Sequence, residues 1–226
     1  MIPRGYSLLL IMICLCLGCS RLPDLNSNEG ALTQVGTEQC RAVFPQGKWQ
    51  FTHAIEAVYP GGGENLLMGV TVVDASRRTI ACALMTVEGL VLFQARLGQS
   101  FDVQRAMPPF DRDGFAAGLL ADIRLIFLQP VAEQLQYGMI KALTATAAEP
   151  ACRYTADNGV ITDILPGDGK NWQIVLYNPQ GNPVRTVTAN PYGEQAGFPG
   201  RLQLVASGPA GYTLKLKLVD AVRLDD

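Results

Sequence analysis

The sequence predicts a mainly antiparallel β fold with one helical insertion, an α+β arrangement. Apolar and polar residues alternate with the two-residue period of strands over most of residues 48–226. The connections between these runs are short and rich in turn residues, which favours antiparallel neighbours. One interruption, at about residues 111–147, has the longer period of helices. We therefore expect a single domain of roughly nine strands over residues 48–226.

The chain begins with the features of a bacterial lipoprotein signal peptide. Residues 1–18 carry one positive charge, Arg4, and then an apolar run over residues 8–17. That run is shorter than the roughly 20 residues that span a bilayer. The Leu-Gly-Cys motif that ends at Cys19 resembles the lipobox, whose cysteine becomes the first mature residue and is acylated. The resemblance implies a protein that is anchored to a membrane through Cys19 without spanning it. An ordinary secretory signal, which leaves a soluble protein, is the alternative.

The residues after the signal peptide predict where the protein resides and how it is held. In the lipoproteins that this motif resembles, a serine in the place of Ser20 permits export to the outer membrane. The resemblance therefore implies the periplasmic face of a Gram-negative outer membrane. Residues 19–47 are otherwise polar and patternless, which predicts a lipidated N-terminus followed by a flexible tether.

Loss of the signal peptide also decides the cysteine and charge balance. It removes two of six cysteines and leaves Cys40, Cys82 and Cys152 besides the lipidated one. In the oxidising periplasm a Cys40–Cys152 disulfide is one expectation, and three free thiols are the other. Cys82 lies in an apolar run and is expected to be buried. Without Arg4 the mature chain has 17 Lys and Arg against 20 Asp and Glu. This net negative charge argues against nucleic acid as a partner.

Two blocks of strands flank the expected helical insertion. In residues 48–59 every second residue is apolar or aromatic, and Pro60 then breaks the pattern. Residues 65–75 and 78–97 are apolar on both faces, so each face needs a cover: a second layer, helices or a bound apolar ligand. After Pro150 the strand pattern returns in three hairpins, the last with a clean alternation of Tyr212, Leu214, Leu216 and Leu218 against Thr213, Lys215 and Lys217.

The insertion is expected to hold two helices. The first has apolar residues at helical spacing from Phe115 to Phe127, with Asp111 or Asp113 to cap its start. Asp122 and Arg124 lie beside this apolar stripe and are expected on a solvated edge. The second helix is expected over residues 131–147.

The sequence contains little that predicts catalysis. His53 is the only histidine and lies on the apolar face of an expected strand, where a packed core residue is the expectation. A metal site would need further ligands, and we find no nucleophile elbow, phosphate loop or Cys-x-x-Cys pair in the mature chain. We therefore expect no enzyme, no metal and no cofactor, with a hydrolase that uses His53 as the alternative.

The central block resembles a known family. The run "ALMTVEGLVLFQARLGQSFDVQRAMPPFDRDGFAAGLLADIRLIFLQP", residues 83–130, resembles the core of an uncharacterised family of proteobacterial outer-membrane lipoproteins. Its members tend to be encoded beside fatty-acid-synthase-like genes for aryl polyene pigments. More loosely, the succession of lipobox, strands, helical insertion and hairpins resembles the LolA and LolB type of lipoprotein carriers and receptors. That resemblance implies an unclosed β-barrel whose concave apolar face is covered by helices and holds acyl chains.

Such a fold gives the strands with two apolar faces a physical reason. One face packs on the protein itself, and the other lines a cavity that helices or lipid must fill. The alternative is a closed core without a ligand. The candidate cavity or lid residues are Trp49, Phe51, Met68, Met85, Leu92, Phe93, Phe115 and Leu119.

Two functions follow from this sequence. The first is a lipid-anchored protein that binds or escorts an acylated or polyene lipid, or a lipoprotein, at the outer membrane. The second is an accessory module without a ligand, which docks on an envelope transport or assembly complex through a strand edge or a surface patch.

Overall fold

The computed structural model describes residues 22–27, 34–59, 62–141, 147–168, 171–208 and 211–224. The predicted signal peptide and the predicted lipidation at Cys19 lie outside the described residues. Within the described ranges, no helix is long and apolar enough to cross a membrane.

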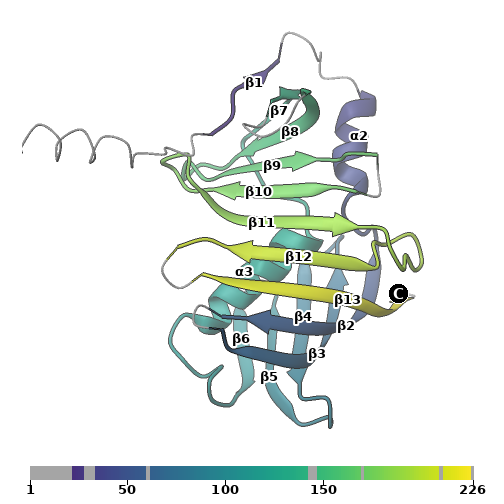
Figure 1. The fold of residues 1–226 in the computed structure, drawn as a ribbon, viewed down its shortest axis with the longest axis vertical. Helices are drawn as coiled ribbons and strands as arrows, with labels where there is room; N and C mark the ends of the chain where they lie inside the picture. Colours follow the sequence, from purple (N-terminus) through teal and green to yellow (C-terminus); the bar gives the residue numbers. More distant parts are fainter. Residues whose placement is uncertain are drawn as a thin grey trace, which may run out of the picture.

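One antiparallel sheet of thirteen strands makes up most of the described chain (Figure 1). The sheet order is β1-β7-β8-β9-β10-β11-β12-β13-β2-β3-β4-β5-β6, so the first and last strands, β1 and β6, do not meet and the sheet stays open. This confirms the expected open antiparallel sheet, although with more than nine strands. The strands are β1 (Leu25–Asn26), β2 (Lys48–Val58), β3 (Glu64–Asp74), β4 (Thr79–Met85), β5 (Val91–Leu97), β6 (Phe101–Ala106), β7 (Gln134–Ile140), β8 (Glu149–Thr155), β9 (Ile161–Leu165), β10 (Gln173–Tyr177), β11 (Pro183–Asn190), β12 (Arg201–Ala206) and β13 (Tyr212–Arg223).

Helix α3 (Phe115–Phe127) crosses the inner face of this sheet, behind β12 and β13 in Figure 1. Gly114 precedes the helix with φ of 77°, a conformation that glycine adopts without the steric cost of a Cβ atom. The chain becomes extended at Leu128, where the helix ends. Helix α3 therefore corresponds to the first of the two helices expected in the insertion. Its apolar face is buried through Leu120, Ile123, Ile126 and Phe127.

The second expected helix is wrong. Residues 134–140 form β7, which pairs with β8 along its whole length. Leu135, Tyr137 and Met139 alternate with polar or small neighbours, and a short apolar run of this kind fits a helix and a strand about equally well by periodicity. The main-chain hydrogen bonds that β8 offers decide for the strand. Residues 142–146 of the expected helix lie outside the described part.

The expected tether also differs from the structure. Helix α2 (Gln34–Ala42) and β1 both lie within residues 19–47. Cys40 is fully buried, and Val43 and Phe44 join the core after the helix ends. Gly36 lets the helix approach the ring of Tyr137, because a Cβ atom there would lie 2.5 Å from a ring carbon. These contacts are tertiary, so the polar sequence of the segment gives no sign of them.

The alternation expected for the last strand is confirmed. In β13, Leu216 and Leu218 are buried in the core, while Lys215 and Lys217 are exposed on the outer face. The core lies between the helices and the inner face of the sheet. One layer of helix on one curved sheet therefore explains why apolar residues predominate on the inner face.

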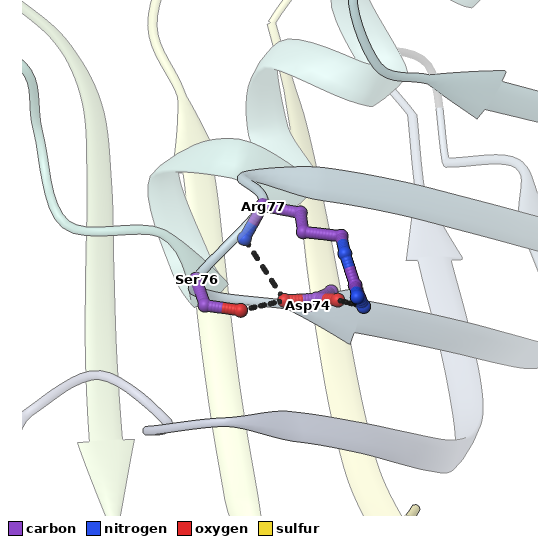
Figure 2. Close-up of polar contacts among 3 residues, drawn as sticks. All are labelled: Asp74, Ser76 and Arg77. Carbon is purple, nitrogen blue, oxygen red and sulfur yellow. Dashed lines mark hydrogen bonds and ion pairs between the residues drawn. The ribbon is translucent and has the colours of Figure 1, made fainter. Parts of the chain in front are cut away.

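The turn between β3 and β4 is closed by a buried carboxylate (Figure 2). Oδ1 of Asp74 accepts hydrogen bonds from the hydroxyl of Ser76 at 2.6 Å and from the backbone N–H of Arg77 at 2.9 Å. Oδ2 accepts one from Nη1 of Arg77 at 2.9 Å. These bonds, led by that from Ser76, lower the pKa of Asp74 to about 2. The next residue, Arg78, donates to the carbonyl of Gln129 at 3.0 Å and so holds the chain just after α3.

A disulfide joins Cys40 of α2 to Cys152 of β8, across a sequence separation of 112 residues. This is the pairing that the sequence offered beside three free thiols. Cys82 remains a free and buried thiol on the inner face of β4. The disulfide fixes the N-terminal helix to the far part of the sheet.

Removing this disulfide is expected to destabilise the protein strongly. For a closed loop of this size, loss of the cross-link lowers the free energy of unfolding by about 3–5 kcal/mol through the entropy of the unfolded chain. Urea unfolding of the Cys40→Ala/Cys152→Ala variant measures the loss. Cys82→Ala is the control, because it also removes a buried sulfur but closes no loop. Equal losses in the two variants would contradict the prediction.

Candidate functional site

An apolar cavity of about 280 Å³ lies between the first half of α3 and the inner face of the sheet. Three parts of the fold supply its walls. They are the start of α3 with the preceding loop, the strands β2, β3 and β4, and the strands β11 and β13. All but two of the lining residues are uncharged, and most are apolar. They are Ile55, Ala57, Tyr59, Leu67, Leu84, Phe110, Gly114, Phe115, Gly118, Leu119, Asp122, Arg185, Tyr212 and Leu214.

Two glycines, Gly118 within α3 and Gly114 just before it, keep the cavity open. A Cβ atom on Gly118 would meet nothing within 4 Å, and the same holds for Gly114. Gly118 has an ordinary helical backbone, and its N–H donates to the carbonyl of Gly114 at 2.9 Å. A glycine inside a helix costs about 1 kcal/mol relative to alanine, so its presence beside empty space lowers stability without any gain in packing.

Three of the predicted cavity residues lie at or next to this site. Phe115 and Leu119 line the cavity directly. Phe93, fully buried, places its ring 6.2 Å from that of Phe115 in an edge-to-face contact and so supports the wall. Leu92 is half-buried and packs against the core, and it is not among the residues that line the cavity.

Trp49 and Phe51 instead belong to a filled part of the core. Phe51 stacks on Phe127 at 4.9 Å, near the end of α3, and Trp49 meets Phe198 edge to face at 4.8 Å. The space left among these rings is only about 20 Å³. The inner face is therefore open beneath the first half of α3 and closed beneath the second half.

Met68 and Met85 lie on the other face of the sheet. They are opposite each other in the β3–β4 ladder, while their chain neighbours Leu67 and Leu84 line the cavity. Successive side chains of a strand point to opposite faces, so the two methionines point outward. Both faces of these strands are apolar, which is why the sequence did not identify the inner one.

A polar cluster interrupts the apolar lining. Asp122 of α3 accepts a hydrogen bond from Nε of Arg185 on β11 at 3.0 Å and another from the hydroxyl of Tyr212 on β13. Asp122 is only 3% exposed, so the expectation of a solvated edge is wrong for this residue. Its carboxylate is buried because two partners from the sheet compensate the charge.

Burial controls the protonation of this cluster. It raises the pKa of Asp122, an effect that the Tyr212 hydroxyl and the Arg185 guanidinium oppose. It also raises the pKa of Tyr212, and the negative charge of Asp122 raises it further. Tyr212 thus stays protonated and donates to the carboxylate. The sequence signal for this cluster was a single acidic residue inside an apolar helical stripe, and its two partners come from distant strands.

The remaining titratable candidates are buried away from the cavity. His53 is 3% exposed beside Phe51 and Phe127, and burial lowers its pKa to about 4. Burial raises the pKa of the Cys82 thiol to about 11. Among the described residues, no group of three His, Cys, Asp or Glu side chains is placed to hold a metal ion. His53 is therefore a core residue here, neutral over the physiological range.

A larger groove of about 520 Å³ lies on the outer face of the sheet, over β12, β13 and β2. Charged side chains line much of it, and Lys215 donates to Glu56 at 2.6 Å. Polar and charged side chains supply most of the lining of this groove, and the Lys215–Glu56 ion pair in it is exposed. The groove is therefore a poorer site for an apolar ligand than the inner cavity.

Comparison with known proteins relates the chain through its fold. No protein-family model and no curated protein sequence matches it. The structure is similar to that of a LolA superfamily protein from Nitrosomonas europaea, with a TM-score of 0.57, 13% identity, and 87% of this chain and 95% of that chain covered. A domain from Vibrio parahaemolyticus, described as an outer membrane lipoprotein-sorting protein, covers 84% and 90% at 12% identity with a TM-score of 0.46. The first likeness shows that this chain has a LolA-like fold.

The buried histidine makes stability depend on pH. The pKa of His53 is about 4 in the folded protein, against 6.5 in the unfolded chain. The unfolded state therefore binds more protons between these values, and stability falls as the pH drops from about 7 to 4, by about 3 kcal/mol in total from this residue. Urea unfolding across this range, compared with His53→Leu, measures the difference. A parallel pH dependence in the two proteins would contradict it.

Breaking the ion pair of the polar cluster is expected to cost more than removing it. Arg185→Met leaves the Asp122 carboxylate buried with one partner, which lowers the free energy of unfolding by about 2–4 kcal/mol. The double variant Asp122→Leu/Arg185→Met removes the uncompensated charge and is expected to be more stable than Arg185→Met. A complete double-mutant cycle by urea unfolding measures the coupling. Additive losses would show that the pair is not coupled.

Proposed function

We propose that the protein is anchored through an acylated Cys19 to the periplasmic face of an outer membrane and binds the chain of an acylated or polyene lipid in the cavity beneath α3. The observation that carries the proposal is an apolar cavity lined by Gly118, where a Cβ atom would meet nothing within 4 Å, on a helix that buries one face. Its volume, about 280 Å³, is close to the lower end of small-molecule sites, roughly 300–1,000 Å³.

The energetics of such binding are favourable. If a chain loses roughly 300 Å² of apolar surface to the cavity, the transfer contributes about 7 kcal/mol before the costs of association. A flexible linear chain can also adapt its conformation to a site between a helix and a curved sheet, where the depth varies. The LolA-like fold supports the same proposal, because the LolA type of lipoprotein carrier that the sequence resembles holds acyl chains on its concave face.

The polar cluster suggests how a ligand would be oriented. Asp122 and Arg185 compensate each other, so the cluster has no net charge and favours an uncharged polar group over an ion. The guanidinium has five N–H donors, and Asp122 and the carbonyl of Val184 accept from two of its nitrogens. A ligand oxygen, such as an ester or acid carbonyl, can accept from the same guanidinium while the chain lies among Leu67, Leu84 and Phe115.

A second candidate function rests on the edge of the sheet. Among the described strands, β6 has a neighbour on one side only, and both Phe101 and Val103 are exposed on it. Such an edge can pair with a strand of another protein. This favours an accessory module that docks on an envelope complex. If no lipid binds to the protein, this function is preferred over lipid binding.

Filling the cavity is expected to abolish lipid binding. Gly118→Leu places a side chain in the empty space without backbone strain, and leucine favours the helix by about 1 kcal/mol over glycine. In a form that begins at Ser20 and is purified without detergent, we expect mass spectrometry to find copurified lipid. We expect the variant to retain less than about a tenth of it, which corresponds to 1.4 kcal/mol.

The matched control is Ala117→Leu, because Ala117 is the exposed neighbour of Gly118 on the same helix. This control is expected to keep the lipid. Binding of a fluorescent fatty acid to both variants repeats the comparison with a defined ligand. The proposal is overturned if the unmodified form neither copurifies with lipid nor binds the fatty acid, or if Gly118→Leu binds as well as Ala117→Leu.

A further inference from the structure

The first described residues form a strap across the outer face of the sheet. We call residues 22–27 the N-terminal strap. Leu25 and Asn26 form β1, which pairs with Ile140 and Met139 at the end of β7. Before that pairing begins, the carbonyl of Pro23 accepts a hydrogen bond from Nη2 of Arg153 at 2.8 Å. The strap is therefore bound to the domain at both of its ends.

A buried ion pair fixes the position of this contact. Nε and Nη2 of Arg153 each donate to a carboxylate oxygen of Asp163 at 2.7 Å, from neighbouring strands β8 and β9. The two side chains are only 9% and 1% exposed. A two-pronged pair of this kind holds the guanidinium in one orientation, so the donor that meets Pro23 is already in place.

The strap begins beside the turn that joins β10 to β11. A Cβ atom built on Gly181 of that turn would lie 3.3 Å from Cβ of Leu22. The N–H of Gly181 closes the turn by donating to the carbonyl of Asn178 at 2.9 Å. The described chain thus begins at one defined turn of the sheet.

The cavity lies near the same ends of the strands as this turn, although on the other face of the sheet. Strands β10, β11, β12, β13, β2 and β3 are consecutive in the sheet and alternate in direction. The β10–β11 turn, the start of β13 and the end of β2 therefore lie side by side, on the left in Figure 1, and we call them the turn row. Arg185, Tyr212 and Tyr59, which line the cavity, lie at or within a few residues of this row. The connection β11–β12 lies on the opposite side.

Covalent geometry limits how far Cys19 can be from the turn row. Cys19 is three residue steps before Leu22, a span of at most about 11 Å. From Gly181 to Arg185 the chain advances four residues, or about 13 Å along the strand. A lipid on Cys19 is thus held close to the side on which the cavity lies. A tether that ran to residue 47 would impose no such limit.

We infer that the N-terminal strap, bound by Arg153, holds the turn row against the surface of the bilayer in which the Cys19 lipid is inserted. The inference rests on the proposed lipidation of Cys19. The partner is the membrane surface itself. In this orientation the side of the sheet that holds the cavity faces the lipid, and the connection β11–β12 faces away. An apolar chain then passes between bilayer and cavity over a short path instead of crossing the periplasm.

The test measures the distance of two matched positions from the membrane. A form that begins at Cys19 is coupled through that thiol to a maleimide lipid in phosphatidylcholine vesicles. Only this thiol reacts, because Cys40 and Cys152 are joined and Cys82 is buried with a pKa near 11. A dye is attached through an unnatural amino acid at Gln180, in the turn row, or at Gln195, in the β11–β12 connection. Both positions are exposed.

Energy transfer to an acceptor lipid is expected to be at least about twofold more efficient from position 180 than from position 195, since the length of β11 separates them by about 27 Å. Inserting about twenty Gly and Ser residues between Arg21 and Leu22 keeps the strap in place but adds a flexible reach of about 25 Å, so this difference is expected to be lost.

Equal transfer from the two positions with the unmodified strap would overturn the inference. A difference that persists after the insertion would also overturn it, because the short connection would then not be the cause. The result is independent of lipid binding, which is measured on the form that begins at Ser20. Mass spectrometry of the N-terminal peptide from cells reports separately whether Cys19 is lipidated.

Discussion

An open antiparallel sheet has an apolar inner face that must be kept from water, and here the helix α3 packs against it, together with α2 at Cys40. The second half of this helix meets large rings, and Phe51 and Phe127 fill the space. The first half presents Gly114 and Gly118 instead, so a cavity remains. The location of the cavity thus follows from the positions at which glycine replaces a side chain that could fill the space.

A helix that covers this face must also be held in position. Asp122 holds α3 through its hydrogen bonds with Arg185 and Tyr212, because burying a carboxylate that is only 3% exposed costs free energy unless these partners compensate its charge. The interaction joins α3 to two strands that are distant in sequence. It lies in the cavity wall, so the group that positions the helix is also the polar group that a bound chain would meet.

The outer face has a comparable constraint. Arg153 and Asp163 are buried there, and the carbonyl of Pro23 in the N-terminal strap accepts a further hydrogen bond from the guanidinium. Together with the disulfide from Cys40 to Cys152, this makes the N-terminal segment part of the domain. A lipid anchor at Cys19 would consequently act on the orientation of the whole domain, since only a few residues lie between the anchor and the first contact.

The sequence by itself determined the class of the fold, the first helix of the insertion and the two-faced character of the strands, because these depend on local periodicity. It also offered Phe115 and Leu119 as candidate cavity residues, and both line the cavity beneath α3. Tertiary structure alone decided that β7 is a strand, that residues 34–42 form a helix, and that Met68 and Met85 face outward. It also decided that Asp122 is buried. For α2 and for Asp122 the partner is remote in sequence, Cys152 and Arg185 respectively, while β7 pairs with the next strand along the chain, β8. The free energy that selects the conformation therefore comes from contacts that no local pattern records.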